Sequence, residues 1–141
     1  MIHRVTIPRE IVSGNALAYR HWRKRMADRD AWIILLRQHA AKVPRATCQR
    51  TVRVTAYRKR RVDEDNLSSG FKHGRDAMVR VGLLIDDNKA GCRFVYNDCL
   101  LLSDLPPEIV AQFGHVPVTT IEILDMDQTT AAPTANQSGK E

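Results

Sequence analysis

Two clusters of acidic residues lie near the middle of a chain whose formal net charge is +6. Asp63, Glu64 and Asp65 form the first cluster, and Asp86 and Asp87 form the second. Carboxylates packed about 4 Å apart repel by about 4 kcal/mol at an effective dielectric constant of about 20. A divalent cation between them removes this cost, and Mg²⁺ prefers oxygen ligands. Together the clusters predict a Mg²⁺ site, whereas either one alone is explained more simply by helix capping or a solvated turn.

The segment between the clusters has the periodicity of a helix. One face carries apolar and small residues, and the opposite face carries Asp65, Lys72 and Asp76. We expect a helix that is capped by Asp65 or Asn66 and ends before Gly82. If residues 62 to 65 are extended, Asp63 and Asp65 point to the same side. We expect the segment after the helix to bring the second acidic cluster back to the first.

Basic residues gather in two further places. A run of four directly precedes the first acidic cluster, and a second group surrounds Tyr19 and Trp22. The sequence pI of about 9.6 favours a polyanionic partner such as nucleic acid. A solvated loop or helix end is the alternative for any single residue. We expect DNA phosphate contacts from the following side chains: Arg20, Arg23, Lys24, Arg25, Arg58, Lys59, Arg60, Arg61, Lys72 and Arg75.

The motifs of this central block together resemble the RusA family of Holliday-junction resolvases. The resemblance is carried by Asp63-x-Asp65-Asn66-Leu67, by Lys72-x-x-x-Asp76-Ala77-Met78, and by Gly82-Leu83-Leu84-Ile85-Asp86-Asp87. Ser13-Gly14-Asn15 followed by Tyr19-Arg20-His21 is similar to the N-terminal segment of the family. The likeness covers approximately residues 5 to 125, and its central block is the specific part.

The resemblance implies a homodimeric, structure-selective endodeoxyribonuclease that resolves four-way DNA junctions by paired nicks in recombination and repair. It implies Mg²⁺ as the cofactor, with Mn²⁺ as a substitute and no organic cofactor. Asp63, Asp65 and Asp87 correspond to its metal-binding catalytic carboxylates, with Asp86 as the alternative ligand. Lys72 corresponds to its catalytic or DNA-contacting lysine. The setting would be the cytoplasm of a bacterial or phage-infected cell.

The remaining pattern predicts an α+β fold. Strands are expected at 2–7, at 51–57 with Val52, Val54 and Ala56 inward, at 93–96 continuing or re-entering at 100–102, and at 116–124. A long helix is expected at about 17–43, with Trp22 on its apolar stripe. We expect one compact domain over residues 1–126, with a small mixed sheet and two main helices, followed by a disordered tail at 127–141. The apolar run Trp32–Leu36 circles its helix, which favours a second layer or a second subunit over it.

Several other classes fit less well. No apolar run approaches 18 residues, so we expect no contact with a membrane, and the three cysteines lack metal-site spacing. Leu83–Asp87 with Gly91 also resembles the phosphoribosyl-pyrophosphate motif of phosphoribosyltransferases, but that fold needs a longer series of parallel strands. A non-catalytic basic DNA-binding protein of the same fold is the stronger alternative.

Overall fold

A mixed β-sheet runs through the centre of the molecule in the computed structural model, which describes residues 2–86, 88 and 91–126. The sheet of this part of the chain contains five strands: β1 (Ile2–Ile7), β2 (Arg50–Arg58), β3 (Cys92–Tyr96), β4 (Leu100–Leu101) and β5 (Val118–Asp125). Their order is β1-β5-β2-β3, and β4 pairs with β2 beyond the end of β3. β5 is antiparallel to both β1 and β2, whereas β3 and β4 are parallel to β2.

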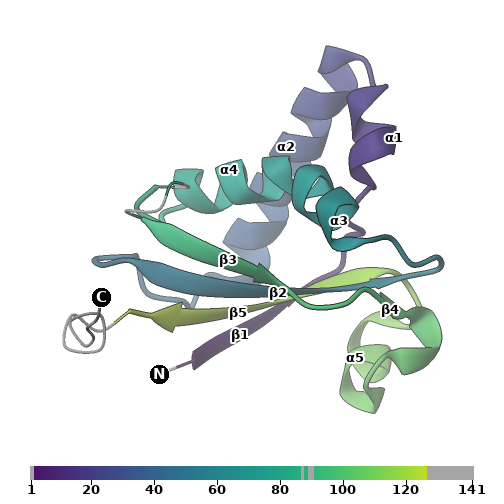
Figure 1. The fold of residues 1–141 in the computed structure, drawn as a ribbon. Helices are drawn as coiled ribbons and strands as arrows, with labels where there is room; N and C mark the ends of the chain where they lie inside the picture. Colours follow the sequence, from purple (N-terminus) through teal and green to yellow (C-terminus); the bar gives the residue numbers. More distant parts are fainter. Residues whose placement is uncertain (1, 87, 89–90, 127–141) are drawn as a thin grey trace, which may run out of the picture.

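Helices pack against one face of this sheet. The described residues form α1 (Gly14–Ala18), α2 (Trp22–His39), α3 (Glu64–Gly70), α4 (Lys72–Arg80) and α5 (Pro107–Phe113). Figure 1 shows α2, α3 and α4 on one side of the sheet and α5 on the other. The expected α+β class with a mixed sheet is therefore confirmed. A phosphoribosyltransferase would need a long series of parallel strands. The described residues do not form one, because β5 is antiparallel to both β1 and β2.

The core fills the space between the sheet and α2, α3 and α4. Val52, Val54 and Ala56 alternate inward along β2, as predicted, and are at most 1% exposed. From the helices, Phe71 is fully buried and meets Trp32 edge to face, with ring centroids 5.1 Å apart. This arrangement agrees with the predicted apolar face of the central helix, and it fixes the helices against the sheet.

The predicted long helix at 17–43 is wrong at both ends. It is divided into α1 and α2 at Tyr19–His21, because His21 has an extended backbone (φ −59°, ψ 146°) and caps α2 by accepting the Arg23 N–H at Nδ1, 3.2 Å away. α2 then ends at His39 rather than near Val43. The division turns Trp22 away from the core. Trp22 was predicted on the apolar stripe but is 57% exposed.

The predicted central helix is also divided, at Phe71, where α3 ends and α4 begins. Its N-terminal cap is Asp63, whose Oδ1 accepts the Asn66 N–H at 2.8 Å, and not Asp65 or Asn66 as expected. The C-terminal prediction is confirmed, because Gly82 follows α4 with φ +86°, a conformation that L side chains rarely adopt.

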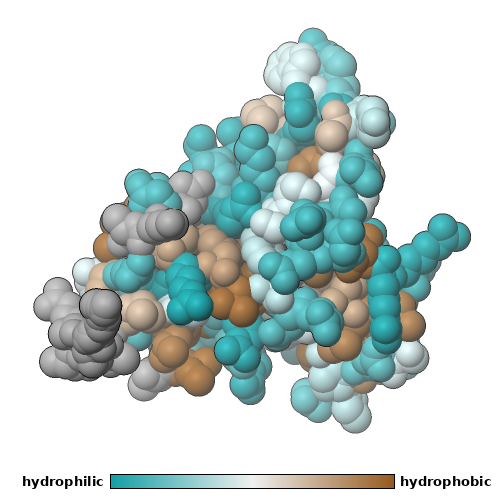
Figure 2. Space-filling view, viewed as in Figure 1, coloured by the Kyte–Doolittle hydropathy of each residue, from teal (hydrophilic) through white to brown (hydrophobic). Residues whose placement is uncertain are grey.

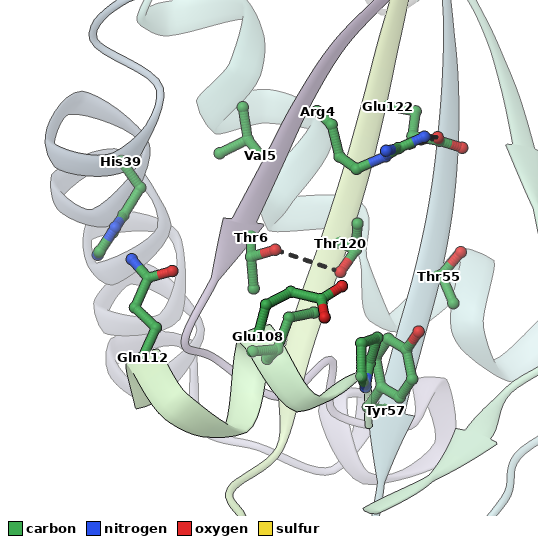
Figure 3. A pocket seen from close by; sticks show the side chains of 12 residues that line it. Arg4, Val5, Thr6, His39, Thr55, Tyr57, Glu108, Gln112, Thr120 and Glu122 are labelled. Atoms are coloured by element: carbon green, nitrogen blue, oxygen red, sulfur yellow. Dashed lines mark hydrogen bonds and ion pairs between the residues drawn. The ribbon is translucent and has the colours of Figure 1, made fainter. Parts of the chain in front are cut away.

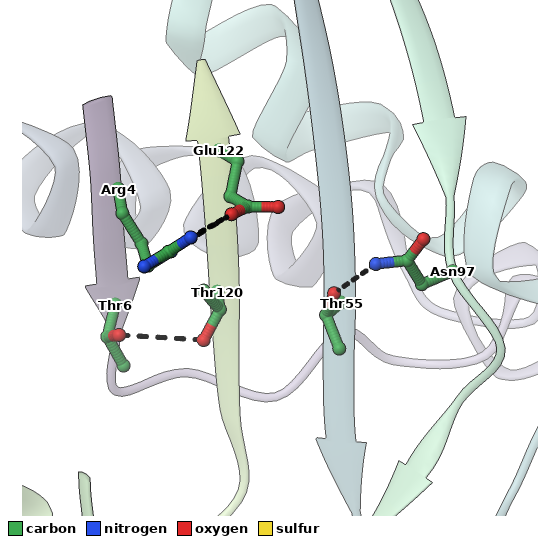
Figure 4. A network of polar contacts seen from close by, with 6 residues as sticks. All are labelled: Arg4, Thr6, Thr55, Asn97, Thr120 and Glu122. Carbon is green, nitrogen blue, oxygen red and sulfur yellow. Dashed lines mark hydrogen bonds and ion pairs between the residues drawn. The ribbon is translucent and has the colours of Figure 1, made fainter. Parts of the chain in front are cut away.

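The other face of the sheet is polar. Arg4 pairs with Glu122, Thr6 bonds to Thr120, and the Asn97 amide donates to Thr55 (Figure 4). α5 covers only one end of this face, over a small cluster around Tyr57, Leu105 and Val118. Between α5 and the strands lies an open hollow of about 610 Å³ with polar side chains on its walls (Figure 3).

None of the helices in the described residues is both long enough and apolar enough to cross a lipid bilayer. The predicted tail at 127–141 lies outside the described residues.

Candidate functional site

The first acidic cluster lies where β2 ends and α3 begins. Asp63 caps α3, and Asp65 lies in its first turn with an exposed side chain. Both charges are near the positive end of the α3 dipole, which stabilises them by about 0.3–1 kcal/mol each. The prediction that residues 62 to 65 are extended fails at Glu64 and Asp65, because both belong to α3. Among the described residues, the Asp65 carboxylate makes no hydrogen bond or ion pair, so it is available to a ligand.

Asn97 and Asp98 lie beside this cluster, although we had predicted no role for them. Together with Arg61, Val62, Asp63, Glu64 and Cys99 they line a hollow of about 220 Å³. The topology explains the meeting: β2 and β3 are parallel, so the residues that follow each strand emerge at the same edge of the sheet. The signal available in the sequence was an acid directly after the next strand.

Asp86, the described member of the second acidic cluster, does not return to the first cluster, so this prediction is wrong. The Asp86 backbone packs on Gly91, where an added Cβ would lie 2.4 Å from the Asp86 nitrogen and oxygen. Gly91 directly precedes β3, and its carbonyl accepts the Arg50 N–H at 3.2 Å, at the start of β2. Asp63 follows the end of β2. The length of β3, about 16 Å, therefore separates the two clusters (Figure 1).

The reason lies in the crossover from β2 to β3. From the end of β2, α3 and α4 carry the chain back to the beginning of β2. Because β3 is parallel to β2, the chain reaches the end near Asp63 again only after β3. Asp86 lies between helix and strand, at the far end. Asp87, which was predicted to be the third metal ligand, lies outside the described residues.

The donors fit a Mg²⁺ ion only in part. Asp63 and Asp65 supply two carboxylates, and Mg²⁺ is usually bound by one or two carboxylates together with waters and phosphate oxygens. However, within the described residues no group of three His, Cys, Asp or Glu side chains is placed to hold a metal. The described residues of the chain therefore provide the right kind of ligand but not the predicted set of three.

Lys72 is exposed at the first position of α4. The prediction that Asp65 and Lys72 lie on one helix face assumed a single continuous helix. The helix is divided at Phe71, so the two residues belong to different helices, α3 and α4. Further along α4, Asp76 pairs with Arg80 at 3.2 Å in an i,i+4 contact, which gives Asp76 a structural role.

Two of the predicted DNA contacts have partners inside the protein. Arg75 donates to the Ser68 carbonyl at 2.6 Å and to the Tyr96 hydroxyl at 2.9 Å, so it ties the α3–α4 junction to β3. The Arg58 side chain is 12% exposed and lies 3.6 Å from Glu10. The three basic residues that follow it, Lys59, Arg60 and Arg61, are exposed beside the acidic cluster.

The other basic group lies on the α1–α2 segment, which is joined directly to α3. The Asn15 N–H donates to the Asn66 Oδ1 at 3.2 Å, so the Asn66 side chain joins α3 to α1 and does not cap α3 as expected. Gly70 approaches the chain before α1 so closely that an added Cβ would lie 1.7 Å from the Val12 carbonyl oxygen. These contacts place Arg20, Arg23, Lys24 and Arg25 on the element next to Asp65.

His73, which was considered a phosphate contact, is only 8% exposed, on the inner side of α4. Burial lowers its pKa below the usual value, and the nearby Asp28 carboxylate counteracts part of that shift. Its Nε2 has no hydrogen-bond partner among the described residues. His73 is therefore a core residue that belongs to the α2–α4 packing.

A scan against protein-family models and a search of curated proteins found no match for this chain.

Proposed function

We propose that this protein is a Mg²⁺-dependent endodeoxyribonuclease that cleaves branched DNA, with four-way junctions as its preferred substrate. The observation that carries the proposal is the placement of the exposed Asp65 and the capping Asp63 directly beside exposed basic residues, Lys59 to Arg61. A nuclease of this kind must hold a phosphodiester and an ion at one place. The motif resemblance of the central block to RusA resolvases supports the same assignment.

The side chains divide this work between them. Lys59, Arg60 and Arg61 bind the phosphates on either side of the scissile bond. Asp63 and Asp65 would hold Mg²⁺, which when bound would supply an acidified water and neutralise phosphate charge. Lys72 offsets the charge that develops on the phosphate oxygens, provided that the bound DNA spans the division between α3 and α4.

We infer that the site is completed by a second copy of the chain. Asp86 is separated from Asp63 by the length of β3, so the two can share an ion only if they come from different protomers. Ile85, next to Asp86, is 54% exposed, and an apolar side chain at this place suits an interface between copies. A dimer would also place two sites at once on a four-way junction, as paired nicks require.

Subunit mixing tests this arrangement. Asp65→Asn and the double variant Asp86→Asn/Asp87→Asn are each expected to bind a synthetic four-way junction and to lose Mg²⁺-dependent cleavage. In a mixed dimer one site receives every substitution and the other receives none, so mixing the two inactive proteins restores nicking of one strand. If each protomer built its own site, the mixture would remain inactive.

A second candidate function is non-catalytic binding of branched DNA. It is favoured by the lack of a three-carboxylate group within the described residues of one protomer. In that case the wild-type protein binds the junction without yielding any product in Mg²⁺ or Mn²⁺. The Asp65→Asn variant would then bind no differently from wild type, and mixing would have no effect.

A further inference from the structure

Two aromatic side chains are left in solvent where α1 meets α2. Tyr19 is 91% exposed and Trp22 is 57% exposed, whereas Trp32 further along α2 is 1% exposed. No other aromatic residue in the described part of the chain belongs to the exposed large hydrophobic residues. We call residues 19–25 the aromatic tip. In Figure 1 it lies at the end of the α1–α2 pair, away from the sheet.

The tip is strongly basic. Its seven residues, Tyr-Arg-His-Trp-Arg-Lys-Arg, include four cations and no acid. The Arg23 guanidinium lies over the Trp22 ring at 5.5 Å, and the His21 ring is tilted against Trp22 with centroids 5.7 Å apart. In the space-filling view this end of the molecule is mostly teal and pale rather than brown (Figure 2). It is therefore not a plain apolar patch but a set of rings surrounded by positive charge.

Rings among cations suit a partner that offers flat π-faces and negative charge together. Exposed bases of nucleic acid have both, and aromatic side chains stack on them with little dependence on sequence. A second copy of this protein is disfavoured as the occupant, because a two-fold contact at the tip would bring two groups of four cations together. Double-stranded DNA away from a branch is also a poor match, because its bases are already stacked.

The tip is close to the proposed cleavage site. α1 is five residues long, so about 7 Å of helix separates the tip from the Asn15–Asn66 contact on α3. Asp65 immediately precedes Asn66. A base stacked on the tip would consequently belong to a nucleotide near the phosphate that the acidic cluster holds.

We propose that Tyr19 and Trp22 form a stacking platform for unstacked bases at the branch point, with the neighbouring cations on the adjacent phosphates. This inference rests on the proposed function only in that the DNA is branched. A base at the branch has an open face that the rings can cover. The platform therefore selects for a branch without reading sequence.

Binding to oligo-dT, a fully paired duplex and a four-way junction, measured in EDTA, tests the platform without requiring cleavage. Tyr19→Ala and Trp22→Ala are each expected to weaken binding to oligo-dT and to the junction by about 5- to 150-fold, the usual range for one stacked base. Duplex binding changes little. The dependence of affinity on salt is unchanged, because no charge is removed.

Ile34→Ala is the matched control, because Ile34 is an exposed apolar residue elsewhere on α2, with 63% of its surface accessible. It is expected to leave all three affinities unchanged. Trp fluorescence gives a second readout: oligo-dT should quench the wild-type emission, and Trp22→Phe should lose that quenching while the buried Trp32 still reports the fold.

Equal weakening on duplex, or no weakening on oligo-dT, would overturn the platform. The same holds if sedimentation shows that Tyr19→Ala and Trp22→Ala separate a dimer, because the rings would then be an interface. Failure of the proposed function is read separately. If the ring variants weaken binding but the wild-type protein cleaves in no metal, the platform is retained and the nuclease is rejected. If the protein cleaves the junction and the ring variants bind as tightly as wild type, the nuclease is retained and the platform is rejected.

Discussion

The two faces of the sheet differ in how they are filled. The inner face is packed against α2, α3 and α4, and its largest side chains, including Phe71 and Trp32, are at most 1% exposed. The outer face carries paired polar groups such as Arg4 with Glu122, and α5 covers only one end of it. The inner face therefore supplies most of the stability. Neither face carries the acidic candidate site, which lies at the edge where β2 and β3 end.

The largest expected effect is on the inner face. Phe71→Ala removes a ring that contacts Trp32, Phe94 and Tyr96, and we expect a loss of about 3–5 kcal/mol in the free energy of unfolding, measured by urea denaturation. Phe113→Ala, in the partly buried cluster under α5, serves as the comparison and should cost clearly less. Equal losses would contradict the difference between the faces.

Backbone contact within the helical layer gives the next effect. An alanine at Gly70 would place its Cβ against the fixed Val12 carbonyl, and we expect Gly70→Ala to cost about 1–3 kcal/mol. Gly14→Ala is the control at the same contact. Its Cβ would lie 1.7 Å from the Ser69 Oγ, which can rotate away, and 2.8 Å from the Ser69 Cβ, which must shift by a few tenths of an ångström, so we expect a smaller loss than at Gly70. Equal thermal shifts for both variants would mean that the α1–α3 contact adapts freely.

The buried His73 should make the inner side sensitive to acid. Its pKa is lowered mainly by burial. Lys72 and Arg25 lower it further, whereas Asp28 and Asp76 oppose the shift, and the net result is that the unfolded chain takes up a proton more readily than the folded one. Stability is then lost as the pH falls through the unfolded value of about 6.5. His73→Gln should reduce the difference in urea midpoint between pH 7.5 and pH 5.5. An unchanged difference would assign the acid sensitivity to other groups.

The smallest effect belongs to the outer face. The Arg4 side chain is 68% exposed, so solvent screens its pairing with Glu122. A double-mutant cycle with Arg4→Ala and Glu122→Ala should give a coupling energy of about 0.2–1 kcal/mol. A much larger coupling would show that the outer face is organised more tightly than its exposure implies.

Much of the fold followed from residue pattern. Alternation along 51–57 identified β2 and its inward side chains, and Gly82 identified the end of α4, because both depend on local geometry. The divisions at Tyr19–His21 and Phe71 could not be predicted in this way. They occur at residues that ordinarily tolerate a helix, and the extended His21 backbone and the packing of Phe71 against Trp32 accompany them.

The candidate site was predicted less completely. Asp63, Asp65 and the basic run before them are consecutive in sequence, so their proximity needed no knowledge of topology. The position of Asp86 required knowing that β3 is parallel to β2, which the helix periodicity does not reveal. The proximity of Asp98 to Asp63 depends on the same parallel pairing, so it was not predicted either. Arg58 and Arg75 were predicted to contact DNA because of their charge, and the sequence does not indicate that they have partners within the protein.

The outer border of the sheet is interrupted where Asn97, Asp98 and Cys99 separate β3 from β4, although both strands pair with β2. A long uninterrupted border would offer a row of free backbone groups to which another polypeptide could add a strand. Here the row is broken into pieces of five and two residues, and an acidic side chain stands in the gap. Uncontrolled strand addition, and the aggregation that follows from it, is thereby discouraged along this border.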